Sequence, residues 1–362
     1  MPLTVLSVAY PLAPVRESTA GGAEQILALL DGALVAAGYR SIVIAQEGSR
    51  CRGTLLPTPL ASGQFDDAAH RRARRAVRLA IDSALTRYSI DLIHLHGIDF
   101  LEYMPEPPIP VVVTLHLPLG WYPTRAFSLM RPNTYLVCVS EAQKRERLAD
   151  AKLCRVIPNG VPVERYRPAA RKGNYAVALG RVCPEKGFHL AFDAASQAGI
   201  PLILAGQVFP YKTHQEYFET MIRPRLRGRH RFLGPVGGGR KNQLLAGASC
   251  LVVPSLVTET SCLVAMEALA SGTPVVAFAR GALSEVVEHG RTGFLVDRTA
   301  QLSPAIREAA TLSSSLCRRR AERNFSATRM LRSYAALYQE LSKANASAMA
   351  TWIKPDCKEA AQ

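Results

Sequence analysis

Short apolar runs alternate with amphipathic segments along the chain. In the first half, apolar runs predict buried strands at 3–10, 41–45, 92–95, 111–115 and 135–139. Between them, apolar side chains at helical spacing predict helices at 22–38, 66–88 and 141–149. Buried strands that alternate with helices are typical of a parallel sheet covered on both faces. The first half is therefore predicted to be a doubly wound α/β domain.

A polar, proline-containing stretch without periodicity, 162–174, separates this series from a second one. The second series has apolar runs at 175–179, 201–205, 230–233, 250–254, 274–278 and 294–296. We assign residues 1–168 to an N-terminal Rossmann-like domain and 169–325 to a C-terminal one. A helix at 326–342 is expected to pack back on the first domain, and 343–362 to form a tail. Ligands of such sheets bind beyond the carboxyl ends of the strands, so two facing domains predict a central cleft.

The composition agrees with a large folded protein. The chain has 362 residues, of which 48% are hydrophobic and 20% charged, unlike collagen-like, disordered or disulfide-scaffold proteins. No apolar stretch reaches the roughly 20 residues that span a bilayer, and residues 1–14 are interpreted as a first strand rather than a signal peptide. The eight cysteines include no C-x-x-C pair, which indicates reduced thiols and a cytoplasmic location.

The net charge of +15 favours anionic partners, such as nucleotides, phosphosugars, nucleic acid or acidic membranes, without choosing among them. The basic segment 70–78 places Arg71, Arg74, Arg75 and Arg78 on one helical face. That face suits peripheral contact with an anionic membrane at its inner face. Its lack of large aromatic side chains favours a solvated helix instead.

Two glutamates eight positions apart carry the strongest chemical signal. Glu259 lies in a loop after a buried strand that stops at Pro254, and Glu267 lies inside a helix that begins near Cys262. The N-terminus of that helix would offer free N–H groups and a positive dipole end to the cleft. One acid could hold hydroxyls of a sugar and the other those of a ribose. The alternative is two acids that contact nothing.

Glycines and cations mark two further strand-to-helix loops. Gly180 allows a tight turn at the end of a strand, and Arg181 and Lys186 bracket the loop that follows. Two cations at such a junction suit a diphosphate and would stabilise negative charge that develops on it. Gly21 and Gly22, before the first helix, would let the backbone approach a ligand closely. Each loop could instead be an ordinary solvated turn.

Histidines near strand ends give weaker signals. His116 ends an apolar run at the predicted cleft and is the histidine best placed to touch a substrate. His94 and His96 would share one face of a strand, but without a third ligand they are better interpreted as core or cleft-lining side chains than as a metal site. The turn signal at 157–161 could mark a structural reversal or a site. The chain has no D-x-D pair and no intact P-loop, so no carboxylate-held metal is expected.

Taken in order, these motifs resemble a known family. The matching stretches are GGAE (21–24), VSEAQKRE (139–146), IPNGV (157–161), LGRVCPEKG (179–187), FLGPV (232–236), the E-x7-E pair, SGTPVVA (271–277) and TGFLV (292–296). Their order over about residues 3–340 is similar to that of the family 4 retaining glycosyltransferases of the GT-B fold. Within that family the closer resemblance is to pterin-glucosylating and antibiotic-tailoring enzymes, to which 217–233 contributes.

The resemblance implies a fold, a donor and roles for residues. The fold would be GT-B, two Rossmann-like domains facing a cleft, and the donor a UDP-sugar or, less often, a GDP- or ADP-sugar, with no cofactor and no metal. Arg181 and Lys186 would bind the diphosphate, Glu259 would face the anomeric carbon, Glu267 would bind ribose hydroxyls, and His116 would contact the donor sugar. The remaining donor-side residues would be Gly21, Gly22, Gly180, Leu233, Gly234, Ser261, Cys262 and Leu263.

One segment departs from the family pattern. Pro-Phe-Gly usually follows the first glutamate, whereas this chain has Thr260, Ser261 and Cys262. Glycine at the third position lets the backbone lie against sugar and phosphate. Cys262 could therefore alter the choice of donor, shift the geometry or weaken the activity.

The resemblance implies a retaining, metal-independent hexosyltransferase that moves a sugar, expected to be glucose, from a UDP-sugar to an acceptor hydroxyl. The acceptor, a small molecule, a lipid-linked sugar or a glycan, would be chosen by first-domain loops such as 117–125, where Trp121 and Tyr122 offer stacking surfaces. No nucleic-acid partner is expected. Two alternatives stay open: a nucleotide-sugar 2-epimerase, which shares this architecture, and a non-catalytic protein that binds nucleotide sugars.

Overall fold

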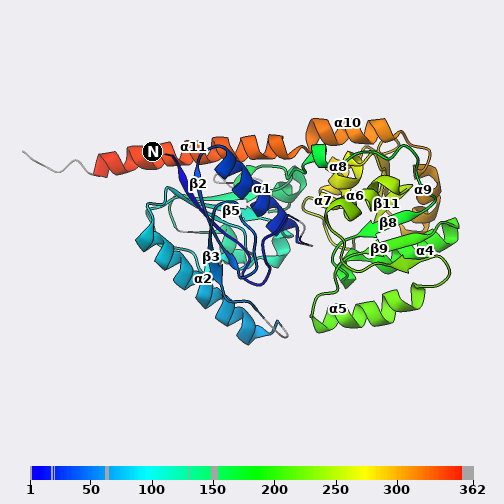
Figure 1. Ribbon diagram of the computed structural model, residues 1–362, viewed down its shortest axis with the longest axis horizontal. Coiled ribbons are helices and arrows are strands. Elements are labelled where there is room, and N and C mark those ends of the chain that lie inside the picture. The colour runs from blue at the N-terminus through cyan, green and yellow to red at the C-terminus, as the bar shows by residue number, and fades with distance from the viewer. Residues whose placement is uncertain are drawn as a thin grey trace, which may run out of the picture.

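The computed structural model describes residues 2–17, 19, 21–61, 65–129, 131–147 and 154–352, with side chains up to residue 343 except at residue 147. Over this part of the chain, two parallel sheets lie side by side, each between layers of helices (Figure 1). The predicted pair of doubly wound α/β domains is confirmed.

The first sheet contains seven strands among the described residues, in the order β3-β2-β1-β4-β5-β6-β7. Their bounds are Thr4–Val8 (β1), Arg40–Gln46 (β2), Thr54–Thr58 (β3), Leu92–Leu95 (β4), Val111–Leu115 (β5), Thr134–Cys138 (β6) and Cys154–Val156 (β7). The sequence patterns missed β3 and β7, which form the two edges. β3 contains Pro57, which an edge strand tolerates because a missing N–H can face away from the neighbouring strand.

The helices of the first half follow the predicted pattern closely. Their bounds are Gly22–Ala36 (α1), Asp67–Arg87 (α2) and Glu141–Arg147 (α3). Residues 148 and 149 of the third predicted helix lie outside the described residues. Asp66 caps α2 by accepting a hydrogen bond from the N–H of Ala69 at 2.7 Å, which fixes where this helix begins.

The second sheet has the order β10-β9-β8-β11-β12-β13. Its strands are Ala176–Leu179 (β8), Leu202–Ala205 (β9), Arg231–Phe232 (β10), Cys250–Val253 (β11), Val275–Phe278 (β12) and Gly293–Val296 (β13). Its helices are Phe188–Ala198 (α4), Lys212–Tyr217 (α5), Gly238–Gly247 (α6), Leu263–Ala270 (α7), Leu283–Val286 (α8), Leu302–Ala309 (α9) and Ser314–Asn324 (α10). The strand order reverses between β8 and β11, and ligands of doubly wound sheets bind at such a point.

The chain crosses between the two halves twice, and the two crossings touch. The N–H of Val161 donates to the carbonyl of Phe325 at 2.8 Å, and the N–H of Ala327 donates back to Val161 at 2.8 Å. A Cβ on Gly160 would lie 2.5 Å from the carbonyl oxygen of Ser326, so only glycine permits this approach. The turn signal at 157–161 therefore has a structural role.

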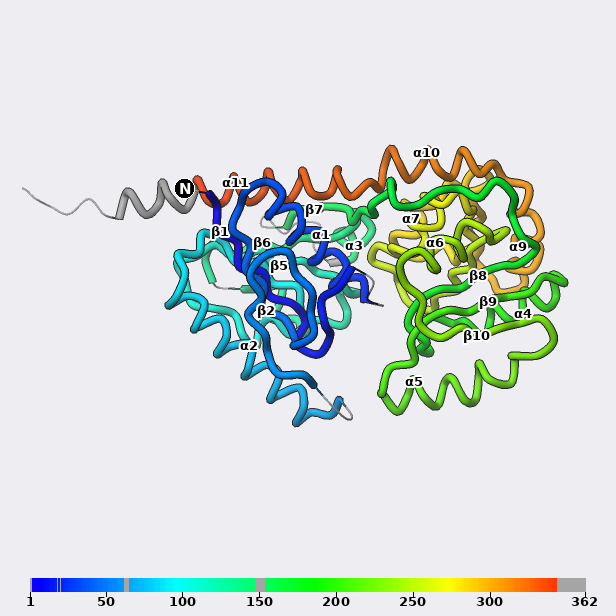
Figure 2. Tube along the Cα trace, viewed as in Figure 1, coloured from blue at the N-terminus to red at the C-terminus, as the bar shows by residue number. Residues whose placement is uncertain are grey.

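The last helix, α11 (Ala327–Trp352), runs back along the first domain (Figure 2). Tyr334 and Tyr338 are buried in a cluster that includes Val5, Leu92 and Val112 of the first sheet. The helix extends past the predicted end at 342 because the residues that follow are rich in alanine, which favours helix without an apolar face.

Two arginines of the basic helix α2 are held by the first domain. Arg74 forms an ion pair with Asp99 at 2.9 Å, and Arg78 reaches the carbonyl of Glu102 at 3.4 Å. Arg71, Arg75 and Arg78 are exposed and Arg74 is half-buried, so the predicted contact of this face with an anionic membrane stays a prediction. Among the described residues no helix is both long and apolar enough to cross a membrane.

Candidate active site

The loops after β8 and β11 meet at the reversal of strand order in the second sheet. The N–H of Leu256 donates to the carbonyl of Glu185 at 2.8 Å. Gly187 has a φ of +61°, and a Cβ there would lie 2.3 Å from the carbonyl oxygen of Pro254. This glycine therefore lets the two loops pack against each other. The cations that follow β8 and the acid that follows β11 are thereby brought together.

Lys186 and Glu259 form a buried ion pair. The Nζ of Lys186 lies 2.5 Å from Oε1 of Glu259, and the glutamate side chain is 9% exposed. Burial alone would raise the pKa of Glu259, but Lys186, and more weakly Arg181, hold it below its ordinary value. Burial alone would lower the pKa of Lys186, but Glu259 raises it. Both groups are therefore charged at neutral pH.

Arg181 extends this charged centre toward the first domain. It is half-buried, and its charge helps to lower the pKa of Glu259. It also acts on Glu24 of α1, a carboxylate that is only 6% exposed. Burial raises the pKa of Glu24, an increase that its own backbone N–H and Arg181 oppose. Glu24, the acid of the GGAE motif, thus lies near the loop that is predicted to bind the diphosphate. The two preceding glycines alone did not indicate this position.

The N-termini of α1 and α7 approach each other across the cleft. A Cβ on Gly22, the first residue of α1, would lie 3.3 Å from Cδ1 of Leu263, the first residue of α7. A Cβ on Gly21 would lie 1.8 Å from Oε2 of Glu24, so the Glu24 carboxyl group lies directly against this turn. Two helix N-termini concentrate partial positive charge in one place. The arrangement is suited to bind an anion between the domains.

Cys262 occupies the position where family members usually have glycine. It has a φ of +60° and a ψ of +66°, the left-handed conformation that glycine adopts most readily. Such a conformation costs roughly 1–2 kcal/mol for other residues. The Cys262 side chain is buried in the core of the second domain, and burial raises the pKa of its thiol to about 12. The backbone path of a glycine is therefore kept. The neighbouring Ser261 is also buried, and its hydroxyl has no partner among the described residues.

Glu267 is held by a second lysine. Its Oε1 accepts from the Nζ of Lys241 at 2.5 Å and from the hydroxyl of Tyr166 at 2.7 Å. Burial, followed by the charge of Glu267, raises the pKa of Tyr166. Beside Glu267 lies a cavity of about 130 Å³ lined by α1, α6 and α7. Because both hydrogen bonds use Oε1, Oε2 can bind a ligand. Neither Lys241 nor Tyr166 was predicted, since each is distant in sequence from Glu267.

His116 belongs to a row of three neutral histidines in the first domain. Its Nε2 lies 2.9 Å from Nδ1 of His96, and burial lowers its pKa to about 3. Both nitrogens of His94 are hydrogen-bonded, to the hydroxyls of Tyr338 at 2.6 Å and Thr114 at 2.7 Å. His94 therefore has no ring nitrogen left for a metal, in agreement with its interpretation as a core residue.

Thr260 links this histidine row to the acid loop. Its hydroxyl donates to the backbone carbonyl of His116 at 2.8 Å, across the two domains. The threonine that replaces the usual proline thus brings His116 beside the loop that carries Glu259. Lys186 and Arg181 act on Glu259, and Thr260 joins His116 to the same loop. Glu267 lies farther along this loop and helix and lines the cavity of about 130 Å³, which none of the other four predicted residues lines.

The backbone positions predicted beside the donor lie at neighbouring strand ends. The N–H of Gly206 donates to the carbonyl of Gly234 at 2.9 Å, and the N–H of Gly180 to Ala205 at 3.1 Å. A Cβ on Gly206 would lie 1.8 Å from the carbonyl oxygen of Gly180. Leu233 follows β10 and its N–H donates to Leu204 at 3.0 Å. These glycines allow three strand ends to pack at the floor of the cleft.

The predicted stacking pair of the acceptor loop is only half correct. Trp121 is 40% exposed and offers a surface to a ligand. Tyr122 is buried, and its hydroxyl accepts from the N–H of Leu117 at 3.3 Å. It supports the loop from beneath because its ring packs between Phe100 and Phe127.

Comparisons with known proteins agree with this geometry. The sequence matches the model of Glycosyltransferase Family 4 over residues 20–165 and that of Glycosyl transferases group 1 over residues 164–325. It is 26% identical over 303 residues to the phosphatidyl-myo-inositol mannosyltransferase of Mycobacterium tuberculosis, covering 73% of this chain and 72% of that protein. With several other curated relatives, the match spans less than half of their length, and with one only 21%.

Solved structures show the same fold. AviGT4, a glycosyltransferase involved in avilamycin A biosynthesis, has a TM-score of 0.72 and 26% identity, covering 94% of this chain and 98% of its own. HepE of Anabaena, solved in complex with UDP-glucose, has a TM-score of 0.73 and 20% identity, covering 93% of this chain and all of its own. With its two parallel sheets and the two consecutive family matches, this chain belongs to the family 4 glycosyltransferases of the GT-B fold.

Proposed function

We propose that the protein transfers a sugar, glucose by preference, from a UDP-sugar to an acceptor hydroxyl with retention of the anomeric configuration. The observation that carries this proposal is the meeting of Arg181, Lys186 and two helix N-termini beside Glu259. The UDP-glucose complex of HepE supports the choice of donor. AviGT4 supports a place near the antibiotic-tailoring branch. We also propose a cytoplasmic location, which the free cysteines support.

Positive charge at the cleft would drive the reaction. As the bond between sugar and diphosphate breaks, negative charge grows on the leaving diphosphate, and fixed positive groups lower the barrier. Arg181, Lys186 and the N-termini of α1 and α7 supply that charge. No added Mg²⁺ or Mn²⁺ is required in this scheme, because these groups are already in place before the donor binds.

Glu259 acts as an electrostatic group in this proposal. Its carboxylate is ionised and held by Lys186, so it can stabilise positive charge at the anomeric carbon in an oxocarbenium-like transition state. The acceptor hydroxyl attacks from the face that the diphosphate leaves and gives its proton to a departing phosphate oxygen. The configuration is retained without a covalent sugar–enzyme bond.

The other predicted residues would position the donor. Oε2 of Glu267 accepts ribose hydroxyls, while Lys241 and Tyr166 hold its Oε1. His116 stays neutral because burial lowers its pKa to about 3. Its Nε2 faces His96, which leaves Nδ1 for a hydroxyl of the donor sugar.

The decisive variant is Glu259→Gln, which keeps the size of the side chain and removes its charge. We expect transfer to fall by at least about 100-fold, while calorimetry shows UDP affinity within about threefold of the wild type. Glu102→Gln, on an exposed ion pair with Arg125, is the matched control. Unchanged turnover in Glu259→Gln would remove Glu259 from the proposed role.

Two measurements separate this function from its alternatives. Thermal shifts with UDP, GDP, ADP and their sugars select the donor, and NMR then follows the anomeric signals with and without acceptors. A 2-epimerase would change the sugar without any acceptor. A non-catalytic binding protein would bind the nucleotide sugar and show no turnover with any acceptor.

A further inference from the structure

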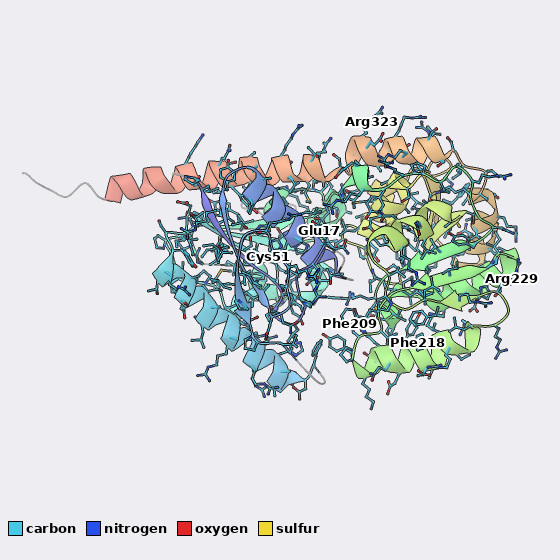
Figure 3. The ribbon with its side chains drawn as sticks, in the orientation of Figure 1. Glu17, Cys51, Phe209, Phe218, Arg229 and Arg323 are labelled. Atoms are coloured by element: carbon cyan, nitrogen blue, oxygen red, sulfur yellow. The ribbon has the colours of Figure 1, made fainter. Side chains whose placement is uncertain are left out.

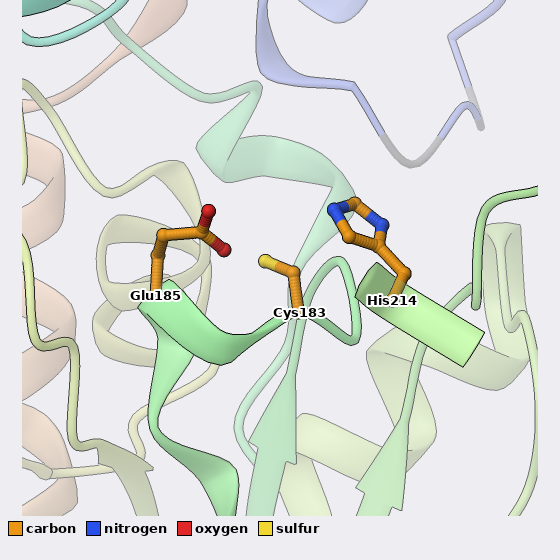
Figure 4. Close-up of side chains that lie close together, drawn as sticks. All are labelled: Cys183, Glu185 and His214. Atoms are coloured by element: carbon orange, nitrogen blue, oxygen red, sulfur yellow. The ribbon is translucent and has the colours of Figure 1, made fainter. Parts of the chain in front are cut away.

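We propose that Cys183, Glu185 and His214 form a metal site suited to Zn²⁺, distinct from the groups proposed for sugar transfer. One ligand atom from each residue, a thiol sulfur, a carboxylate oxygen and an imidazole nitrogen, lies within 4.8 Å of the other two. Figure 4 shows the Cys183 sulfur between the carboxylate and the imidazole ring.

The fold brings these residues together from two neighbouring strands. Cys183 and Glu185 belong to the loop after β8, and His214 lies in α5, which follows β9. β8 and β9 pair in parallel, and beyond their ends the N–H of Val182 donates to the carbonyl of Gln207 at 2.9 Å. The two segments therefore leave the sheet side by side.

Two of the three residues present polar atoms without protein partners. Oε2 of Glu185 and Nδ1 of His214 are buried and accept or donate no hydrogen bond among the described residues. Cys183 is 1% exposed and His214 8%. Leaving a buried polar atom unsatisfied costs about 1–3 kcal/mol. A cation between them would satisfy the carboxylate and the imidazole together.

The donor set selects the metal. A thiolate, an imidazole and a carboxylate with a fourth position for water match the ligands that Zn²⁺ takes in tetrahedral sites. Ligand atoms around a tetrahedral Zn²⁺ lie about 3.5 Å apart, so the cluster would need to contract by about 1 Å. Small side-chain rotations provide such a shift.

The net charge of the occupied metal site is compatible with the nearby cation Arg181. Arg181 is close enough to act on both Glu185 and His214. On binding, Zn²⁺ displaces the proton of the Cys183 thiol to solvent, and the thiolate and carboxylate then neutralise the two positive charges of the metal. The occupied site is therefore neutral, one charge more positive than the empty one.

An occupied site would tie the loop that carries Arg181 and Lys186 to α5. Ahead of α5, the ring of Tyr211 contacts Phe65 of the first domain edge-on, with centroids 5.4 Å apart. Phe209, which Figure 3 labels on the side of the second domain that faces the first, packs against His214 with ring centroids 6.5 Å apart. The metal would therefore reinforce one wall of the cleft.

The test uses the full chain stripped of metal by a chelator. Zn²⁺ titrated by calorimetry should bind at one site per chain, and Co²⁺ at that site should show the near-ultraviolet band of a cobalt–thiolate bond. Cys183→Ser should abolish this band, and Cys183→Ser and His214→Gln should each weaken Zn²⁺ binding by more than about 100-fold, beyond the loss expected for an outer partner. Cys51→Ser and His70→Gln are the matched controls.

The proposal fails if Zn²⁺ does not bind, or if Cys183→Ser leaves affinity and the cobalt band unchanged. A cooperative thermal melt without ligand in each variant shows that it is folded. Because the readouts are metal binding and a spectrum, this result does not depend on sugar transfer, and either proposal can fail while the other stands.

Discussion

Two glutamates on the same loop and helix of the second domain each pair with a lysine from another segment, and the two pairs differ in their surroundings. In both, the lysine Nζ lies 2.5 Å from a glutamate Oε1. Glu259 faces a second cation, Arg181, and lies beside two helix N-termini. Glu267 instead shares its oxygen with the neutral hydroxyl of Tyr166, next to a cavity.

Under the proposed function, this difference assigns Glu259 to the transfer step and Glu267 to binding of the donor. Two cations, Lys186 and Arg181, act on Glu259, and in the proposed function they stabilise a leaving group that becomes more negative. Around Glu267 one cation balances one anion, and a neutral hydroxyl fixes the carboxylate. In the proposed function, this carboxylate holds ribose hydroxyls in one orientation. Variants of the two pairs should therefore affect different kinetic constants.

The largest effect is expected from the two lysines. Lys186→Met should lower turnover by about 10³-fold, because it removes positive charge from the leaving diphosphate. Lys241→Met, its counterpart in the second pair, should mainly raise the KM for the donor. Steady-state kinetics with the donor varied measures both constants, and thermal melting shows whether each variant folds. Equal losses of turnover in the two variants would contradict the expectation that the two pairs affect different kinetic constants.

A smaller effect is expected from Glu267→Gln. The amide keeps the shape of the side chain but accepts weaker hydrogen bonds, so UDP affinity should fall by about tenfold, or about 1.4 kcal/mol, with turnover changed by less than about threefold. Calorimetry with UDP and a transfer assay at saturating donor separate the two quantities. A large loss of turnover with full UDP affinity would assign Glu267 to the chemistry instead.

The smallest effect is expected on the pH dependence of stability, to which the buried histidines His94, His96 and His116 contribute. The folded pKa of His116 is about 3, whereas an unfolded histidine titrates near 6.5, so below that value the unfolded chain binds more protons. The contribution of His116 to the free energy of unfolding is fully present above pH 6.5. It is lost on acidification below that value, by about 1.4 kcal/mol per pH unit for each histidine whose pKa is lowered in this way. His94 and His96 add to this loss, because burial lowers their pKa values too.

Unfolding free energies measured between pH 7.5 and 5 check this expectation. His116→Gln should reduce the acid-side slope by about one proton. A slope that is the same in His116→Gln and in the wild type would show that His116 does not contribute to the pH dependence.

The sequence patterns predicted the regular parts of this structure and the loops that carry the site. Apolar runs such as 111–115 identify strands because both faces of the sheets are covered. The positions of Arg181, Lys186 and Glu259 follow from where their strands end. Those signals are local, and the resemblance to the family added roles to them.

The missed features depend on contacts between distant segments. Lys241 and Tyr166 reach Glu267 from elsewhere in the chain, and Thr260 meets His116 across the cleft. His214 joins Cys183 only because β8 and β9 are neighbours. No spacing in the sequence predicts these contacts, since each depends on tertiary packing.

The paired crossings between the halves also restrict how the molecule can move. Val161 and Ser326 lie on the two connections that the described residues make between the halves. The N–H of Val161 donates to the carbonyl of Phe325, and the N–H of Ala327 donates to the carbonyl of Val161, which holds these connections together. Both connections must therefore bend at the same point. A rotation of the two halves about this point would keep those hydrogen bonds, whereas sliding one connection past the other would break them. If the two halves open to admit the donor and close over it, this motion should therefore be a rotation about one hinge.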